Sequence, residues 1–317
     1  MNLHGHFWTI WPHLAGRIAP PRPGRAVPFR AVVEDPRRGP VPLSGARYGA
    51  GDDLVVVVHG MGGSHESAYV LRMVAAVRRA GFSALALSLR GADGSGADFY
   101  HAGIAEDVAA ALAAPSLAPV RRIALVGFSL GGHVALRYAL APTDARVRAV
   151  AAICPPLDLD RTRAHIDAPR ALPYRRHLLA ELVRMYARVA RRGGGPIPLA
   201  RARRIRTIYA WDAAIVAPRF GFDGAESYYE QMSVGPHLGR VTVPALLVAA
   251  RHDPMVPLSS LEPSLRRIAP GGPVDVRIVD LGGHVGFPAD ARLGRAPGGR
   301  HPYDDVVAWL AERLRAP

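Results

Sequence analysis

Short, uninterrupted apolar runs alternate with segments of helical periodicity along most of the chain, and this alternation constrains the fold more than any other feature. The runs are continuous, as expected for strands buried on both faces of a parallel sheet. Six runs have this character, at 54–58, 84–89, 123–126, 149–153, 245–250 and 274–279. Strands and helices that alternate in this way predict a doubly wound, mostly parallel sheet with helices on both faces.

Helices are expected where apolar residues recur at a spacing of three or four between and after these runs. The segments with this spacing are 69–80, 104–113, 131–140, 258–268 and 303–315.

The alternation breaks once, in a long segment that contains no convincing strand. Residues 175–190 have the pattern of an amphipathic helix, and Gly-Gly-Gly-Pro at 193–196 forms a flexible break. An insertion of this size between two core strands predicts a helical lid over the carboxyl edge of the sheet. We therefore expect core residues 1–156, a lid at 157–240, and the rest of the core at 241–317.

The formal net charge of +14 raises the question of a nucleic-acid partner. All 40 basic residues are arginine, and Ala, Gly and Pro are abundant, which indicates a coding bias rather than selection for a cationic surface. The arginines are scattered, with a mild concentration at 161–206, and no basic stripe with interleaved aromatic residues is present. We expect no nucleic-acid partner, while attraction to anionic lipid or to an acidic substrate stays open.

The cysteine content and the N-terminus indicate a cytoplasmic protein. Cys154 is the single cysteine, which excludes an intramolecular disulfide, and it reads as a small residue at a strand end. No apolar run approaches the length of a membrane span, and the N-terminus lacks the pattern of a secretory signal.

An apolar cluster near the N-terminus consists of Phe7, Trp8, Ile10 and Trp11. We expect it to pack against the domain, with a weak peripheral membrane contact as the alternative.

The strongest chemical signal is Gly127-Phe128-Ser129-Leu130-Gly131, directly after one predicted strand and directly before a predicted helix. A serine on such a strand-to-helix turn is held in a strained backbone conformation, and neighbouring backbone comes so close that the flanking positions must be glycine. The pattern therefore predicts that Ser129 is a nucleophile.

A serine hydroxyl needs a general base, and the base needs an acid that orients it, in the chain order serine, acid, histidine. His284 follows the last strand in Gly-Gly-His-Val-Gly and is the predicted base. His301 is the only later histidine and reads as a surface residue before the C-terminal helix. Asp253 follows the strand at 245–250, where nearby prolines favour a sharp turn, and is the predicted acid. The alternative acid is Asp158, one strand earlier.

An oxyanion hole requires two backbone N–H donors. Leu130, after the nucleophile, should supply one, and Met61 in the loop His59-Gly60-Met61-Gly62-Gly63-Ser64 should supply the other.

This glycine-rich loop matches neither a dinucleotide-binding fingerprint nor a phosphate-binding loop with its lysine. No His/Cys/Asp cluster in the sequence suggests zinc. We therefore expect neither a cofactor nor a metal.

A series of short motifs spans nearly the whole chain: HFWTI at 6–10, HGMGGS at 59–64, LRG at 89–91, FYHAG at 99–103, GFSLGG at 127–132, IYAWD at 208–212, FGF at 220–222, SYY at 227–229 and GGHVGF at 282–287. This series resembles the YheT-like α/β-hydrolases, which are related to the ABHD-type lipases and esterases. The resemblance implies carboxylic ester hydrolysis and gives the same nucleophile, acid and base.

Three functions are consistent with these residues. The first is a serine esterase or lipase that works through an acyl-enzyme on a small-molecule ester. The second is an acyltransferase on the same three residues, and the third is a non-catalytic binding protein that retains the fold. The composition of the predicted lid, with Leu, Met, Val, Tyr and many Arg, is compatible with medium or long acyl chains and an anionic head group.

Overall fold

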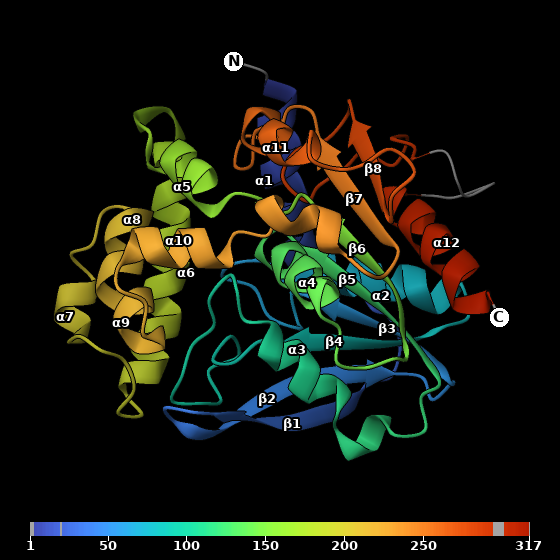
Figure 1. The fold of residues 1–317 in the computed structure, drawn as a ribbon, viewed down its shortest axis with the longest axis horizontal. Coiled ribbons are helices and arrows are strands. Elements are labelled where there is room, and N and C mark those ends of the chain that lie inside the picture. Colours follow the sequence, from blue (N-terminus) through green and yellow to red (C-terminus); the bar gives the residue numbers. More distant parts are fainter. Residues whose placement is uncertain (1–2, 20, 294–300, 317) are drawn as a thin grey trace.

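An eight-stranded sheet forms the centre of the computed structural model, which describes residues 3–19, 21–293 and 301–316. The spatial order of the strands is β1-β2-β4-β3-β5-β6-β7-β8 (Figure 1). The pairs from β4 to β8 are all parallel, and β2 is antiparallel to both of its neighbours. The strands are β1 (Val27–Asp35), β2 (Gly39–Tyr48), β3 (Asp53–Val58), β4 (Ser83–Ser88), β5 (Arg122–Phe128), β6 (Val147–Ile153), β7 (Ala245–Ala250) and β8 (Val274–Val279).

All six predicted strands are present, and the predicted mostly parallel α/β-hydrolase sheet is confirmed. The hairpin of β1 and β2 was not expected. Along β1, exposed residues alternate with buried ones, and both strands contain prolines and arginines that interrupt any continuous apolar run. Such a pattern is typical of an edge hairpin with one solvated face, and it lacks the continuous apolar run of a strand that is buried on both faces.

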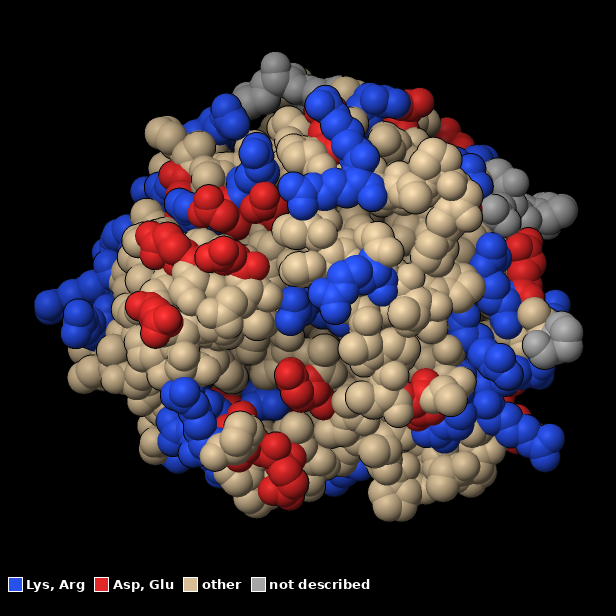
Figure 2. All heavy atoms as spheres, viewed as in Figure 1, with Lys and Arg blue, Asp and Glu red and all other residues tan. Residues whose placement is uncertain are grey.

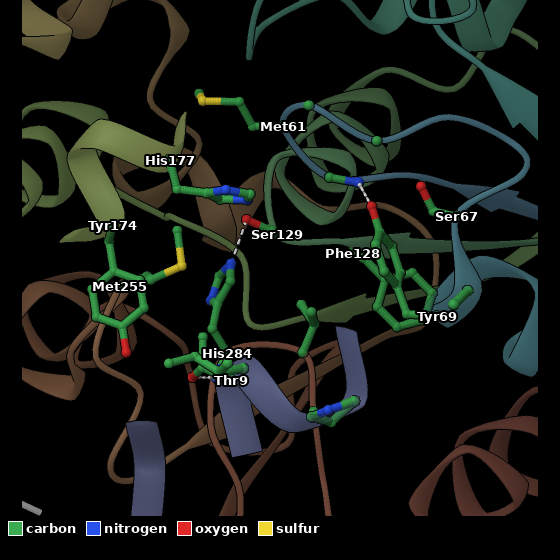
Figure 3. Close-up of a pocket in the computed structure, with 18 of the residues that line it drawn as sticks. Thr9, Met61, Ser67, Tyr69, Phe128, Ser129, Tyr174, His177, Met255 and His284 are labelled. Atoms are coloured by element: carbon green, nitrogen blue, oxygen red, sulfur yellow. Dashed lines mark hydrogen bonds between the residues drawn. The ribbon is translucent and has the colours of Figure 1, made fainter. Parts of the chain in front are cut away.

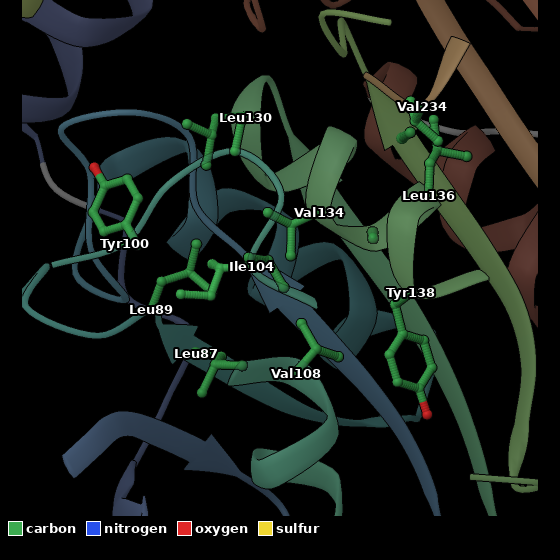
Figure 4. Close-up of a cluster of buried hydrophobic side chains, with 14 of the residues drawn as sticks. Leu87, Leu89, Tyr100, Ile104, Val108, Leu130, Val134, Leu136, Tyr138 and Val234 are labelled. Carbon is green, nitrogen blue, oxygen red and sulfur yellow. The ribbon is translucent and has the colours of Figure 1, made fainter. Parts of the chain in front are cut away.

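Helices cover both faces of the sheet, and successive residues of each central strand point to opposite sides. In β3, Val56 packs in the core beneath α3 (Ala105–Leu112) and α4 (Leu130–Leu140), part of which Figure 4 shows. The next residue, Val57, packs in a separate core beneath α2 (Ala68–Arg79) and α12 (Pro302–Arg315). Both faces of the strand are therefore buried, as its continuous apolar run predicts. On the first side, α11 (Leu258–Leu265) contributes Leu261.

The chain between β6 and β7 is helical, as expected, and stands to one side of the sheet (Figure 1). Its longest helix, α6, includes the segment predicted at 175–190. Its helices are α5 (Leu159–Asp167), η2 (Pro169–Ala171), α6 (Leu172–Ala190), α7 (Leu199–Ala202), α8 (Ile208–Trp211), the π-helical η3 (Asp212–Val216), α9 (Ala217–Phe220), α10 (Ala225–Met232) and η4 (Gly235–Arg240). Within the described ranges, none of the protein's helices is long and apolar enough to cross a membrane.

The N-terminal segment forms a helix that the sequence did not predict, α1 (Leu3–Ile18). The expectation that its apolar cluster packs against the domain is wrong for Phe7, Ile10 and Trp11, whose side chains are about half exposed. The physical reason is the close approach of the helix backbone to the domain. A Cβ on Gly5 or Gly16 would collide with neighbouring atoms, so small residues occupy the inner face and large ones point outward.

Acidic and arginine side chains are interspersed on the face drawn in Figure 2. No continuous basic stripe crosses this face.

Candidate active site

Ser129 lies at the turn between β5 and α4, with φ 51° and ψ −119°. Positive φ is unusual for a residue with a Cβ atom and requires strong local support. A Cβ on Gly127 would collide with the backbone of Gly131, and a Cβ on Gly131 would collide with the backbone at the end of β3. The two glycines therefore allow the tight turn that holds the serine above the carboxyl edge of the sheet.

A continuous chain of hydrogen bonds joins the three residues that the sequence singled out. His284 Nε2 lies 2.8 Å from Ser129 Oγ, which Figure 3 shows as a dashed line, and His284 Nδ1 lies 2.8 Å from Asp253 Oδ2. The backbone N–H groups of Met255 and Val256 donate to the other oxygen of Asp253, at 2.8 and 2.9 Å. With the proton on Nδ1, the carboxylate accepts a hydrogen bond from Nδ1–H, and the unprotonated Nε2 can accept a hydrogen bond from the serine hydroxyl.

The topology brings these side chains together. Ser129 follows β5, Asp253 follows β7 and His284 follows β8, and all three strands point their carboxyl ends to the same edge of the sheet. The alternative acid is elsewhere: Asp158 caps α5, where its carboxylate accepts from the backbone of Arg161.

His301 is not the surface residue that the sequence suggested. It caps α12, where it forms a capping box with Asp304, and its ring packs against Tyr303 with centroids 4.4 Å apart. Burial lowers its pKa to about 4.

The sequence did not predict the role of Thr9, which anchors the loop that contains His284. The hydroxyl of Thr9, on α1, accepts the backbone N–H of His284 at 2.8 Å and donates to Gly5 O at 2.8 Å. A Cβ on Gly283 or Gly286 would collide with the backbone of α1. The helix therefore seats the histidine loop directly. The available signal was the motif at 6–10, which carries part of the family resemblance.

Two tyrosine hydroxyls fix the loop that follows β3. Tyr69 Oη accepts from Gly60 N at 2.8 Å, and Tyr100 Oη accepts from Gly62 N at 2.6 Å. Burial raises the pKa of Tyr69 to about 12, so this hydroxyl stays protonated. Between these amides, the Met61 N–H donates to no group in the described part of the chain, and it stays available as an oxyanion donor.

Leu130, the other predicted donor, is the first residue of α4. The N–H groups of a helix's first turn have no partner within the helix and carry its positive dipole end. Its location is therefore suited to stabilising negative charge beside Ser129.

His59 braces the start of the same loop. Its Nδ1 lies 2.7 Å from Gly60 O, and its Nε2 accepts from Leu89 N at 3.1 Å, across to the end of β4. Burial lowers the pKa of His59 to about 4, which keeps the ring neutral and the Nε2 acceptor intact.

A cavity of about 730 Å³ opens beside Ser129 and is mostly apolar. Its walls come from α1, α2, α6 and the loops after β3, β7 and β8; the side chains labelled in Figure 3 include Met61, Tyr69, Phe128, Tyr174, His177 and Met255. A smaller pocket of about 80 Å³ also reaches Ser129, from the side of the helical insertion. It is lined partly by Asp212, whose pKa burial raises to about 7.

One group of described side chains has metal-ligand character. The ligand atoms of Cys154, Asp253 and His284 lie within 4.8 Å of one another. Two of these residues already hydrogen-bond each other at 2.8 Å, and burial raises the pKa of the Cys154 thiol well above its usual range, which disfavours the thiolate that metals bind. The donor set therefore does not fit a metal centre. Cys154 directly follows β6, which confirms the expected position at a strand end, and its side chain is buried.

Comparison with known proteins identifies the family. The alpha/beta hydrolase fold family matches residues 53–195. The chain is 32% identical to the YheT protein of Escherichia coli over 274 residues, which cover 82% of this chain and 74% of that protein. The chain belongs to the YheT-like α/β-hydrolases. This hydrolase is also 31% identical over 192 residues to a Synechocystis protein named as an esterase, covering 59% of this chain and about half (51%) of that one.

Solved structures share the fold of this YheT-like hydrolase at low sequence identity. An esterase of Pyrococcus furiosus has a TM-score of 0.53 and 20% identity, covering 82% of this chain and 85% of that one. A 2,6-dihydroxy-pseudo-oxynicotine hydrolase has a TM-score of 0.58 and 17% identity, covering 97% of this chain and 72% of that one. These likenesses establish the α/β-hydrolase fold.

Proposed function

We propose that this protein hydrolyses carboxylic esters through an acyl-enzyme formed on Ser129. The observation that carries the proposal is the hydrogen-bonded series Ser129, His284 and Asp253, with both links 2.8 Å long, beside a mostly apolar cavity. The YheT-like family and the esterase names among the relatives support it.

The geometry suits two successive displacements at the ester carbonyl. His284 Nε2 takes the hydroxyl proton as Ser129 Oγ attacks the carbonyl carbon, and Asp253 stabilises the imidazolium that forms. The Met61 and Leu130 N–H groups stabilise the negative oxygen of the tetrahedral intermediate. When the intermediate collapses, the imidazolium donates its proton to the departing alcohol, and the acyl group stays on Ser129. Water, deprotonated by His284, then releases the acid and restores the serine.

The two cavities suggest how the substrate lies. The large one has the size and apolar character to bury a medium or long acyl chain. The small one, with Asp212 in its wall, has room for a small leaving group. The helical insertion supplies walls of both, which supports its proposed role as a lid.

The direct test is labelling with a fluorophosphonate probe together with a panel of chromogenic esters of graded acyl length. We expect the wild type to be labelled and to hydrolyse the esters. Ser129→Ala should lose labelling and at least about 1,000-fold of kcat, because the substitution removes the hydroxyl that attacks the ester in this proposal. His301→Ala is the matched control, since this histidine caps a helix outside the site, and it should keep its labelling.

Wild-type protein that neither reacts with the probe nor turns over any ester would contradict the proposal. Product analysis in the presence of a competing alcohol distinguishes hydrolysis from acyl transfer. Exclusive formation of the new ester would identify a transferase that uses the same serine.

A further inference from the structure

Six large apolar side chains of α1 are exposed on the surface of the protein. Leu3, Phe7, Ile10, Leu14 and Ile18 follow one another at spacings of three or four, which places them on one stripe of the helix. Together with the adjacent Trp11, they are between 45% and 82% exposed. Six of the eleven large apolar side chains that are exposed in the described part of the chain therefore belong to this single helix.

This arrangement reverses the usual orientation of a surface helix, which buries its large apolar residues. The inner face of α1 presents Gly5, Thr9 and Gly16, because the backbone lies too close to the domain for larger residues. Phe7 and Trp11 stack on each other on the outside, with ring centroids 5.9 Å apart. Contiguous exposed apolar surface of this kind is typical of a docking site.

The charge around the helix indicates which partner covers it. The first 33 residues contain four arginines and no acidic residue. Arg22 and Arg25 follow the helix within its next seven residues and are exposed. An amphipathic helix with Trp, Phe and Leu on one face and arginines nearby is the composition that binds the surface of an anionic bilayer.

The apolar stripe continues into the candidate active site. Leu3 and Ile10 belong to the stripe and also line the large cavity beside Ser129. His6, on the same helix, lies 2.5 Å from the hydroxyl of Tyr174 on α6, so α1 and the helical insertion meet at this cavity. A bilayer in contact with the stripe would therefore lie at the border of the cavity.

We propose that α1 is an interfacial docking helix that places this protein on anionic lipid membranes, with the outward stripe of Leu3, Phe7, Ile10, Trp11, Leu14 and Ile18 in the bilayer surface. The docking does not depend on the proposed ester hydrolysis. Apolar insertion and arginine attraction both contribute, so binding requires the stripe and is strengthened by anionic lipid.

The test is flotation of the full-length protein with phosphatidylcholine vesicles, with and without phosphatidylglycerol, at low and high salt. Ser129→Ala serves as the background, so lipid turnover cannot alter the vesicles. The double variant Phe7→Ser/Ile18→Ser removes two stripe residues that do not line the cavity and keeps Trp11 as a reporter. Val27→Ser/Val32→Ser is the matched control, because both side chains are similarly exposed but lie on β1, outside the stripe.

We expect binding to vesicles that contain phosphatidylglycerol, weakened by salt, with part of the tryptophan emission quenched by brominated acyl chains. The Phe7→Ser/Ile18→Ser pair should lower the partition coefficient about tenfold or more, and the control pair should leave it unchanged. Both pairs of substitutions are also made in protein that retains Ser129. There, hydrolysis of a short, water-soluble ester should be the same as in the wild type.

Three outcomes would overturn the proposal. The first is wild-type protein that stays unbound at low salt. The second is equal binding by the stripe variant, which would show that arginines alone adsorb the protein. The third is a wild-type dimer in sedimentation equilibrium that the stripe variant converts to a monomer, which would show that a second copy covers the stripe.

Discussion

Thr9 shows how a residue outside the proposed catalytic residues can hold one of them in place. Its hydroxyl accepts a hydrogen bond from the His284 backbone N–H, and it reaches the histidine loop from a helix 275 residues away in the chain. The imidazole must lie within hydrogen-bonding distance of both Ser129 and Asp253, so a small displacement of its backbone would lengthen one of the two links. We therefore regard Thr9 as a positioning residue.

Replacing Thr9 with valine keeps the side-chain shape and removes the hydroxyl. We expect kcat for a soluble ester to fall about 10- to 100-fold, because the loop loses its anchor and the base is misplaced. Thr9→Ser keeps the hydroxyl and should restore activity to within about twofold of wild type. Steady-state kinetics with thermal unfolding of each variant provides the measurement. A valine variant with wild-type kcat and a lower melting temperature would assign Thr9 a purely structural role.

At the scale of the elements, buried charges tie the helical insertion to the sheet. Arg219, on α9, hydrogen-bonds Asp98 through Nε at 2.7 Å and through Nη2 at 2.5 Å. Arg90, after β4, pairs with Asp98 at 3.1 Å, with Asp35 at 2.7 Å and with Asp107 of α3 at 2.6 Å. All five side chains are nearly fully buried. The network therefore joins β1, α3 and α9, which are remote in sequence.

Removing one arginine from this network should destabilise the fold strongly. Arg219→Met leaves three buried carboxylates with one arginine, and we expect the free energy of unfolding to fall by about 3–5 kcal/mol. The matched control is Arg251→Met, since Arg251 is 48% exposed and pairs with the exposed Asp280; it should cost less than about 1 kcal/mol. Urea unfolding of both variants measures the difference. Equal losses would show that the buried network contributes no more than a surface pair.

At the scale of the whole molecule, buried titratable groups make stability depend on pH in two opposing ways. Burial lowers the pKa of His59 to about 4 and that of His101 to about 3. At pH values between these folded-state pKa values and the unfolded pKa of about 6.5, the unfolded chain binds more protons than the folded protein. The contribution of these two histidines to the free energy of unfolding therefore decreases as pH falls through this range. Burial raises the pKa of Asp212 to about 7, so its ionisation removes stability as pH rises from about 4 to 7.

Asp212→Asn isolates the second contribution. The variant lacks the buried carboxyl, so its free energy of unfolding should rise relative to that of the wild type as pH increases from 4 to 7. The upper limit of this relative gain is about 1.4 kcal/mol for each unit by which the pKa of Asp212 is raised. The amide oxygen can still accept the hydrogen bond of 2.8 Å from Tyr229. Urea unfolding at several pH values tests this expectation. A constant difference between the two proteins would mean that Asp212 has an ordinary pKa in the folded state.

Local features of the sequence determined the parallel core and the candidate nucleophile. Continuous apolar runs are required wherever both faces of a strand are covered, and the glycines around Ser129 are required by a turn that involves only adjacent residues. Asp253 and His284 could be placed because each lies in the loop that follows a predicted strand, and the carboxyl ends of parallel strands share one edge. The sequence also predicted the helical character of the insertion, where apolar residues recur at helical spacing.

Tertiary structure alone decided which residues support those groups. The anchoring of His284 by Thr9, the bracing of Gly60 and Gly62 by two tyrosines, and the network of Arg90 and Arg219 all join segments far apart in the chain. The outward orientation of the α1 stripe belongs to the same class, since apolar spacing marks one face of a helix without saying what that face meets. Periodicity and turn chemistry act between near neighbours in the chain, whereas these contacts depend on how separate elements pack.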